Sequence, residues 1–300
     1  MRNLKFAALA ALCLGSAPAG AQSQIPTQAP HDWRLLGFQQ NQGVLGVMFV
    51  DAASVRSASG AKTVVIAVVF DKPSGPGAEK VSKAEVTYEV DCETTSFTAL
   101  KMVVVANGKE RPATFAPRSP KPYTPGNNIG EAAIATCSGD FTTLAPLQST
   151  VEAEAQRWFG QRIVLIQAMT GTRWQRLMIK RQKPNRGLSF AIRESVTRLP
   201  GGTRYEVFGT RFNETPMGNI TRMDYRMRID CAAQTAEMVL GEVHRTDGSS
   251  QAWIPNIPAS PIEPDSEIAV LADAVCTGDW GKTVAQTGPV ESLAEAIFAK

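Results

Sequence analysis

Most of the hydrophobic pattern along the chain is of the kind that β-strands produce. Residues 64–70 form a continuous, β-branched apolar run, which predicts a buried strand. Apolar and polar residues alternate at 86–91 and again at 224–230, which predicts strands with one buried face. An Asn107-Gly108 pair and an Asp247-Gly248 pair follow these two segments and predict hairpin turns.

A helical pattern stands near the end of each half of the chain. Ser149 and Glu152 have the spacing of a capping box. The apolar residues around them recur on one helical face: Val151, Ala155, Trp158 and Phe159. In the second half, Gly288-Pro289 predicts a helix start, and the apolar residues that follow are Val290, Leu293, Ala294, Ile297 and Phe298. We interpret both stripes as core-facing.

The same cysteine-framed segment occurs twice. Asp91-Cys92 recurs as Asp230-Cys231, and Cys137 recurs as Cys276, both at an offset of 139 residues. Other landmarks recur at a similar offset: Trp33 and Trp174, Ser54-Val55 and Ser195-Val196, Gly60 and Gly201, and Val151-Glu152 and Val290-Glu291. A period of this length indicates a duplicated domain rather than a solenoid of short repeats.

These elements predict an α+β fold in two homologous, small antiparallel-sheet domains, each closed by a C-terminal helix and one disulfide. The first copy spans residues 33–159 and the second residues 174–300, with a connection at 160–173. That connection contains an apolar run at 163–166, which is compatible with a strand joining the two copies.

Residues 1–21 have the layout of a secretory signal peptide. Arg2 and Lys5 precede a short apolar stretch, and Ala19-Gly20-Ala21 fits the small-residue cleavage pattern. Cys13 lies within the apolar stretch, without the leucine-led pattern expected before a lipid-anchored cysteine. No later stretch approaches the roughly 20 apolar residues of a spanning helix. We therefore expect an exported protein without a transmembrane segment, in the periplasm or at the cell surface, with a leader at 22–32.

Removal of the signal peptide leaves four cysteines in an oxidising compartment. Of the three pairings that four cysteines allow, the repeat selects Cys92–Cys137 and Cys231–Cys276, one bridge in each copy. A metal site would need closely spaced ligands, and the sequence has no Cys-x-x-Cys or Cys/His cluster. We therefore expect two disulfides, no metal and no cofactor.

A series of landmarks runs through the first copy: Trp33-Arg34-Leu35-Leu36, Phe49-Val50-Asp51, Ser54-Val55, Gly60, Tyr88-Glu89-Val90-Asp91-Cys92 and Cys137. This series resembles the bacterial surface-adhesin protein E family. The second copy departs from it, with Ile192-Arg193-Glu194 near the Phe-Val-Asp position and Met227 in place of Tyr88. The resemblance implies exported, disulfide-bonded domains of antiparallel strands with a C-terminal helix. The namesake of the family binds host extracellular proteins, but the matching residues are framework, so none of its binding residues carries over.

Side chains suited to catalysis are few. The histidines are His31, in the leader, and His244, so a Ser-His-Asp or metal site would need His244 at its centre. We favour an ordinary surface or turn histidine. Ser138-Gly139-Asp140 and Thr277-Gly278-Asp279 follow a cysteine in each copy, and we interpret them as turns because no Gly-x-Ser-x-Gly motif is present. We do not expect an enzyme, and hydrolase-like activity ranks third among the hypotheses.

The net charge of +3 is unevenly distributed along the chain. Residues 160–228 contain 14 basic and 4 acidic residues, whereas residues 229–300 contain 3 basic and 11 acidic ones. Arg222, Arg226 and Arg228 share a strand face, and further basic residues lie upstream: Arg173, Arg176, Lys180, Arg181, Lys183 and Arg186. They could bind an acidic glycan, a lipid head group or an extracellular protein. The interpretation we favour is that they pair with the acidic half of their own domain. Nucleic acid is not expected.

Proline-rich segments lie inside both disulfide loops. Pro255, Pro258, Pro261 and Pro264 recur every three residues, and the first copy has Pro112, Pro117, Pro120, Pro122 and Pro125 in the matching place. Such a segment could present Tyr123, or Trp253 and Ile254, to a partner. It could equally cover a sheet edge and block aggregation.

The sequence thus favours an exported, non-enzymatic cell-envelope protein, with tandem adhesin-E-like domains acting as a binding or scaffold module. Its candidate ligand-binding residues are Arg222, Arg226, Arg228, Trp253 and Tyr123. The alternative is a purely structural periplasmic protein that self-associates as a homo-oligomer.

Overall fold

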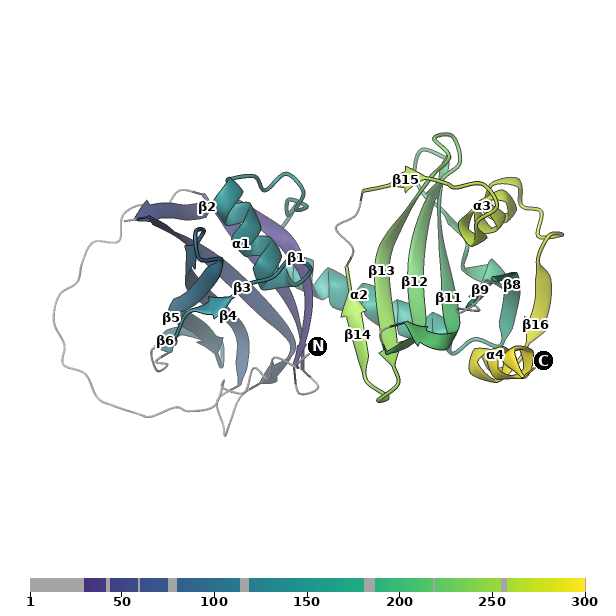
Figure 1. Cartoon of the computed structure of the whole chain (residues 1–300), viewed down its shortest axis with the longest axis horizontal. Helices are drawn as coiled ribbons and strands as arrows, with labels where there is room; N and C mark the ends of the chain where they lie inside the picture. The colour runs from purple at the N-terminus through teal and green to yellow at the C-terminus, as the bar shows by residue number, and fades with distance from the viewer. Residues whose placement is uncertain are drawn as a thin grey trace. The chain divides into compact units, whose positions relative to one another are not determined.

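The computed structural model describes residues 30–41, 44–58, 60–74, 80–113, 119–180, 187–217, 219–254 and 258–299. The predicted signal peptide and most of the leader lie outside these residues. The chain divides into two compact units at the Phe159–Gly160 bond. Both units combine an antiparallel sheet with helices, so the predicted α+β class is confirmed (Figure 1).

The sheet of the first unit is an antiparallel meander. Its strands pair in chain order: β1 (Trp33–Asn41), β2 (Val44–Ala58), β3 (Ala61–Ser74), β4 (Val81–Asp91), β5 (Ser96–Ala106) and β6 (Lys109–Ala113), with β7 (Lys121–Pro122) also on β5. The buried run predicted at 64–70 lies within β3. Asn107-Gly108 forms the predicted turn between β5 and β6, with φ of 51° and 75°.

The sheet of the second unit has the order β14-β13-β12-β11-β9-β8-β16. Its main strands are β8 (Arg173–Lys180), β9 (Gly187–Ala191), β11 (Arg204–Met217), β12 (Ile220–Asp230), β13 (Thr235–Arg245), β14 (Ser250–Trp253) and β16 (Val284–Thr287). Shorter elements are the 3-10 turn η1 (Arg193–Ser195), β10 (Thr197–Arg198), which pairs with β11, and β15 (Ser260–Pro261), which pairs with β13. Asp247-Gly248 lies in the predicted turn between β13 and β14.

Each unit contains a helix that the hydrophobic pattern did not predict. These helices are α1 (Asn128–Ser138) and α3 (Glu267–Thr277), and the side chains of Asn127 and Ser266 cap their N-termini. Both end at a glycine in the left-handed region, Gly139 and Gly278. The repeated Ser-Gly-Asp and Thr-Gly-Asp turns are therefore helix C-caps. Helix α1 packs an alanine-rich face on the core of its sheet, and α3 packs Leu271, Ala272 and Val275 on the core of the other.

Both predicted disulfides are present. Cys92–Cys137 and Cys231–Cys276 have Cα–Cα distances of 5.6 and 5.7 Å. Each first cysteine directly follows a strand, β4 or β12, and each second cysteine lies in the last turn of α1 or α3. The bonds therefore tie the end of each helix to the sheet that it covers.

The predicted helix near residue 150 is α2 (Val151–Met169), but the sequence-based capping is wrong. Thr150, not Ser149, caps it, because the Thr150 Oγ1 accepts a hydrogen bond from the Ala153 N–H at 3.2 Å. The helix begins one residue later than the capping box requires, and the Glu152 side chain is paired with Lys83 instead.

The joining strand considered for residues 163–166 is also wrong, because α2 continues through this run. Leu165 and Met169 are buried four residues apart, whereas Ile163, Val164 and Ile166 are exposed. This spacing is that of a one-sided helix and not of a strand. The last helix, α4 (Val290–Phe298), begins after Pro289 as predicted and buries Val290 and Ala294.

Candidate functional site

The three arginines predicted to bind a ligand lie on one face of β12, and each has carboxylate partners within its own unit. Arg222 pairs with Asp224 and Glu291, Arg226 with Glu206, and Arg228 with Glu206 and Glu237. These pairs agree only in part with the favoured interpretation: Glu237 and Glu291 belong to the acidic half of the domain, whereas Glu206 and Asp224 lie in the basic stretch itself. Of the upstream basic residues, Arg181, Lys183 and Arg186 lie outside the described residues.

The aromatic residues predicted for the proline-rich segments differ in exposure. Trp253, at the end of β14, is 39 % exposed. Ile254 is 5 % exposed, so the expectation that it faces a partner is wrong: its side chain is part of the interior. Tyr123 is half-buried against the core, and its hydroxyl lies 3.5 Å from the Cys137 Sγ.

The proline-rich segments themselves end in short strands. Pro122 lies in β7 and pairs with Ser96 on β5, and Pro261 lies in β15 and pairs with Thr235 on β13. These pairings favour the interpretation in which the segments cover a sheet edge. Pro117 and Pro255 lie outside the described residues.

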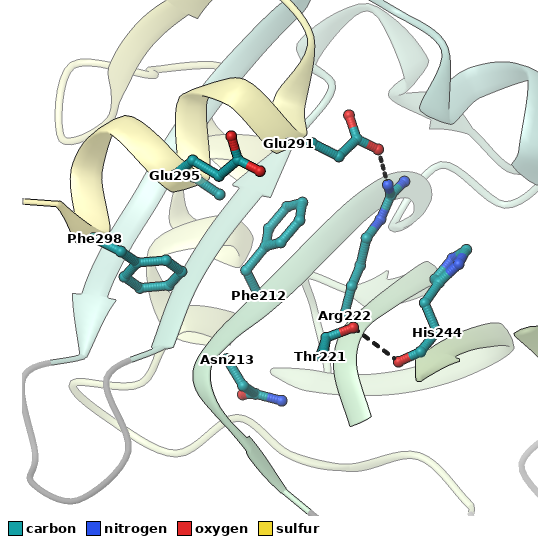
Figure 2. Close-up of a pocket in the computed structure, with 9 residues that line it drawn as sticks. Phe212, Asn213, Thr221, Arg222, His244, Glu291, Glu295 and Phe298 are labelled. Atoms are coloured by element: carbon teal, nitrogen blue, oxygen red, sulfur yellow. Dashed lines mark hydrogen bonds and ion pairs between the residues drawn. The ribbon is translucent and has the colours of Figure 1, made fainter. Parts of the chain in front are cut away.

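A cavity of about 340 Å³ lies between α4 and the sheet of the second unit (Figure 2). The residues that line it are Phe212, Asn213, Thr221, Arg222, His244, Glu291, Ala294, Glu295 and Phe298. Figure 2 shows Arg222 extending from the sheet toward Glu291, with Phe212 rising toward α4 beside it. Of the predicted site residues, this cavity includes Arg222 alone.

A buried carboxylate organises the sheet side of this cavity. Asp224 is 4 % exposed and accepts two hydrogen bonds from Arg222, at 2.6 and 2.9 Å. His244 places its Nε2 2.8 Å from the Asp224 Oδ2. Burial raises the pKa of Asp224, but the hydrogen bond with His244 and the charge of Arg222 outweigh it, so the pKa lies below its ordinary value. Asp224 therefore holds both neighbours while it stays ionised.

His244 lies in a strand, so the turn position considered from the sequence is wrong, while its side chain is partly exposed at the surface. It lies on β13 directly opposite Arg222 on β12. The hydrogen bond to Asp224 fixes the imidazole orientation, which is the geometry of a histidine–carboxylate pair. Among the described residues, no group of three or more His, Cys, Asp and Glu side chains is arranged to hold a metal ion.

Arg222 also connects the sheet to α4. Its guanidinium pairs with Glu291 in the first turn of the helix, and it lies 5.4 Å from the centre of the Phe212 ring. The Arg222 side chain is 12 % exposed and that of Asp224 is 5 % exposed, so the solvent screens this pair weakly, whereas Glu291 is largely exposed. A single guanidinium therefore joins β12, the Phe212 ring and the closing helix.

The first unit contains the same connection. The Lys83 Nζ on β4 lies 3.1 Å from a carboxylate oxygen of Glu85 on the same strand and 2.8 Å from one of Glu152 on α2. Burial lowers the pKa of Lys83, but hydrogen bonds to Glu152 and Glu85 outweigh it and hold the pKa above its ordinary value. Lys83, Glu85 and Glu152 precede Arg222, Asp224 and Glu291 by the same 139 residues.

The two units differ at the cavity itself. At the same offset, the first unit has Val105 in place of His244 and Gln156 in place of Glu295. The exchange at Glu295 and the cation–carboxylate connection were missed in the sequence analysis. A comparison of the charged positions of the two halves at the offset of 139 residues would have revealed the Glu295 exchange and the connection.

None of the helices in the described ranges is long and apolar enough to cross a membrane. No protein-family model matches this chain, and no curated protein matches it in sequence.

Proposed function

We propose that this chain is an exported, non-enzymatic cell-envelope protein, built from two copies of a domain of the surface-adhesin protein E type and acting as a binding or scaffold module. The observation that carries the proposal is the cavity under α4. The second unit has a cation–carboxylate connection like that of the first unit, and a lined cavity lies beside it.

Matching hydrogen bonds support the duplication. The Ser54 hydroxyl donates to the Asp51 carbonyl and accepts from the Val65 N–H. Ser195 makes the same two bonds, to Ile192 and from Phe208. Asp91 and Asp230 each accept two backbone N–H groups in the turn that follows, and both disulfides close loops with a sequence separation of 45 residues.

The interactions of the His244–Asp224 pair with its neighbours support binding over catalysis. Asp224 is shared between His244 and Arg222, and Arg222 in turn holds α4 through Glu291. Moving a proton through this pair would disturb the charges that attach the helix to the sheet. The pair thus serves to position residues around the cavity.

Export is supported by the signal-peptide pattern at 1–21 together with the two disulfides, since such bonds persist in oxidising compartments. With the resemblance of the first copy to surface-adhesin protein E, this favours a role in the periplasm or at the cell surface. The ligands to consider are acidic glycans, lipid head groups, extracellular proteins and small molecules of the envelope.

The test is a retention assay with immobilised, oxidised protein comprising residues 22–300. Envelope extracts, lipid vesicles, glycans and matrix proteins are passed over it at low and high salt. Retention of a specific component supports the binding module, and its loss at high salt would assign the interaction to charged residues. Failure to retain any component at low salt contradicts the proposal.

Self-association is the second candidate, and one observation favours it. Two edge strands of the second sheet carry exposed large apolar residues, Trp253 on β14 and Val284 on β16. Exposed apolar edge strands favour pairing with another sheet. A molar mass that rises with concentration in light scattering, and that falls to the monomer value in Val284→Lys, would support this function. A constant monomer mass would exclude it.

A further inference from the structure

We propose that the cavity under α4 binds a small organic cation, an amine or guanidinium attached to an apolar body. This inference rests on the proposed binding function and names the ligand class of one site. It follows from the charge around the cavity, from the aromatic residues that line it, and from the residues that differ between the two units.

The charge around the cavity is negative at neutral pH. The lining contains one guanidinium, that of Arg222, and two carboxylates, those of Glu291 and Glu295, and the buried Asp224 carboxylate pairs with Arg222 behind it. Arg222 is already engaged by Asp224 and Glu291 through three of its N–H groups. Within the described residues, the exposed Glu295 carboxylate has no hydrogen-bond or ion-pair partner. A bound cation would supply that partner and offset the local excess of negative charge.

The apolar part of the lining comes from two phenylalanines and an alanine. Phe212 belongs to β11, and Ala294 and Phe298 belong to α4. Aromatic rings attract a cation at their faces and also pack against an apolar body. The lining therefore suits a molecule that carries a cation and an apolar body. The cavity volume of about 340 Å³ is at the lower end of the range for small-molecule sites.

In the first unit, buried aromatic side chains pack together in the corresponding region. Phe159, which corresponds to Phe298, is buried, and its ring lies 6.5 Å from that of Phe38. Trp158 packs on the same Phe38 ring, whereas the second unit has Ile297 at the matching position. The exchange of Gln156 for Glu295 places a carboxylate in the lining of the cavity. The residues that the two units share hold the helix, and those that differ shape the cavity.

The test is calorimetric titration of oxidised protein, residues 22–300, with 2-phenylethylamine. The neutral 2-phenylethanol and the anionic phenylacetate serve as matched ligands of similar shape. We expect the amine to bind about tenfold more tightly than the alcohol, because an ion pair and a cation–π contact are lost in the alcohol. Glu295→Gln, which installs the residue of the first unit at an exposed position, should weaken amine binding about threefold to fivefold.

Glu263→Gln, which removes an exposed carboxylate outside the cavity, is the control for overall charge and should leave amine binding unchanged. Three results would overturn the proposal: equal binding of amine and alcohol, an equal effect of the two glutamate variants, or tighter binding of phenylacetate. Absence of any amine binding would do the same. If an envelope component is nevertheless retained in the separate retention assay, the binding function stands and only the cation site fails.

Discussion

Arg222 on β12 is paired with Glu291 in the first turn of α4. A carboxylate in the first turn of a helix is also favoured by the helix dipole, so Glu291 stabilises α4 in two ways. Lys83 and Glu152 make the corresponding connection between β4 and α2 in the first unit. The attachment of the closing helix to the sheet through one partly buried cation is thus the feature that the two units have most clearly in common.

Replacement of this cation should loosen the second unit. Arg222→Gln leaves the buried Asp224 without its bidentate partner, and removing one member of a buried pair costs about 3 kcal/mol. We expect the urea midpoint of the second unit to fall accordingly. The control is Arg173→Gln, at an exposed arginine, and it should be nearly neutral. Equal midpoints for the two variants would show that Arg222 does not hold the helix.

The stability of the second unit should fall in acid because of Asp224. Its pKa is lower in the folded chain than the ordinary aspartate value of about 4, so its stabilising effect is complete above that value. The effect is lost as the pH falls through the lower folded pKa. Asp224→Asn should therefore unfold at lower urea than the native chain at pH 7, and the two should converge in acid. A difference in urea midpoint between the two proteins that stays constant from pH 7 down to acid would contradict this role.

Two helix glycines should respond in opposite ways to alanine. A Cβ at Gly130 would lie 1.9 Å from the Thr124 carbonyl oxygen, so Gly130→Ala must displace the start of α1. We expect a loss of about 2 kcal/mol, as for other overpacked sites. Gly160, inside α2, has open space at its Cβ position, and Gly160→Ala should gain up to about 1 kcal/mol through helix propensity. Thermal unfolding of both variants checks these two predictions. Stabilisation by Gly130→Ala would refute the close contact.

Each disulfide should stabilise its own unit. A loop of this size contributes about 4 kcal/mol in the chain-entropy model. The double variant Cys231→Ser/Cys276→Ser should therefore lower the unfolding transition of the second unit and leave that of the first in place. Cys92→Ser/Cys137→Ser is the reciprocal control. A loss shared equally by both units would mean that the two do not unfold separately.

Local and repeated signals in the sequence predicted much of the fold. The Asn107-Gly108 and Asp247-Gly248 turns were legible because hairpins of this kind require residues that tolerate positive φ. The disulfide pairing followed from the repeat. Helices α1 and α3 were missed, although Asn127 and Ser266 at their starts and Gly139 and Gly278 at their ends are typical capping residues.

The candidate site was harder to predict because it depends on contacts between distant segments. Arg222 and Glu291 are 69 residues apart, and no local pattern joins them. The arginines were identified correctly as residues of one strand face, but apart from Asp224 their partners come from β11, β13 and α4. The exposure of Ile254 was misjudged because the proline-rich segment was taken to be exposed along its whole length.

The measurement that tests the account most directly is the retention assay repeated with the double variant His244→Val/Glu295→Gln. These changes give the cavity under α4 the residues that the first unit has at the two matching positions, and they leave Arg222 and Glu291 in place. We predict that an envelope component retained by the native protein is released from the variant, while both fold equally well by circular dichroism. Equal retention by the two proteins, or no retention by the native one, would contradict the assignment of this cavity as a binding site.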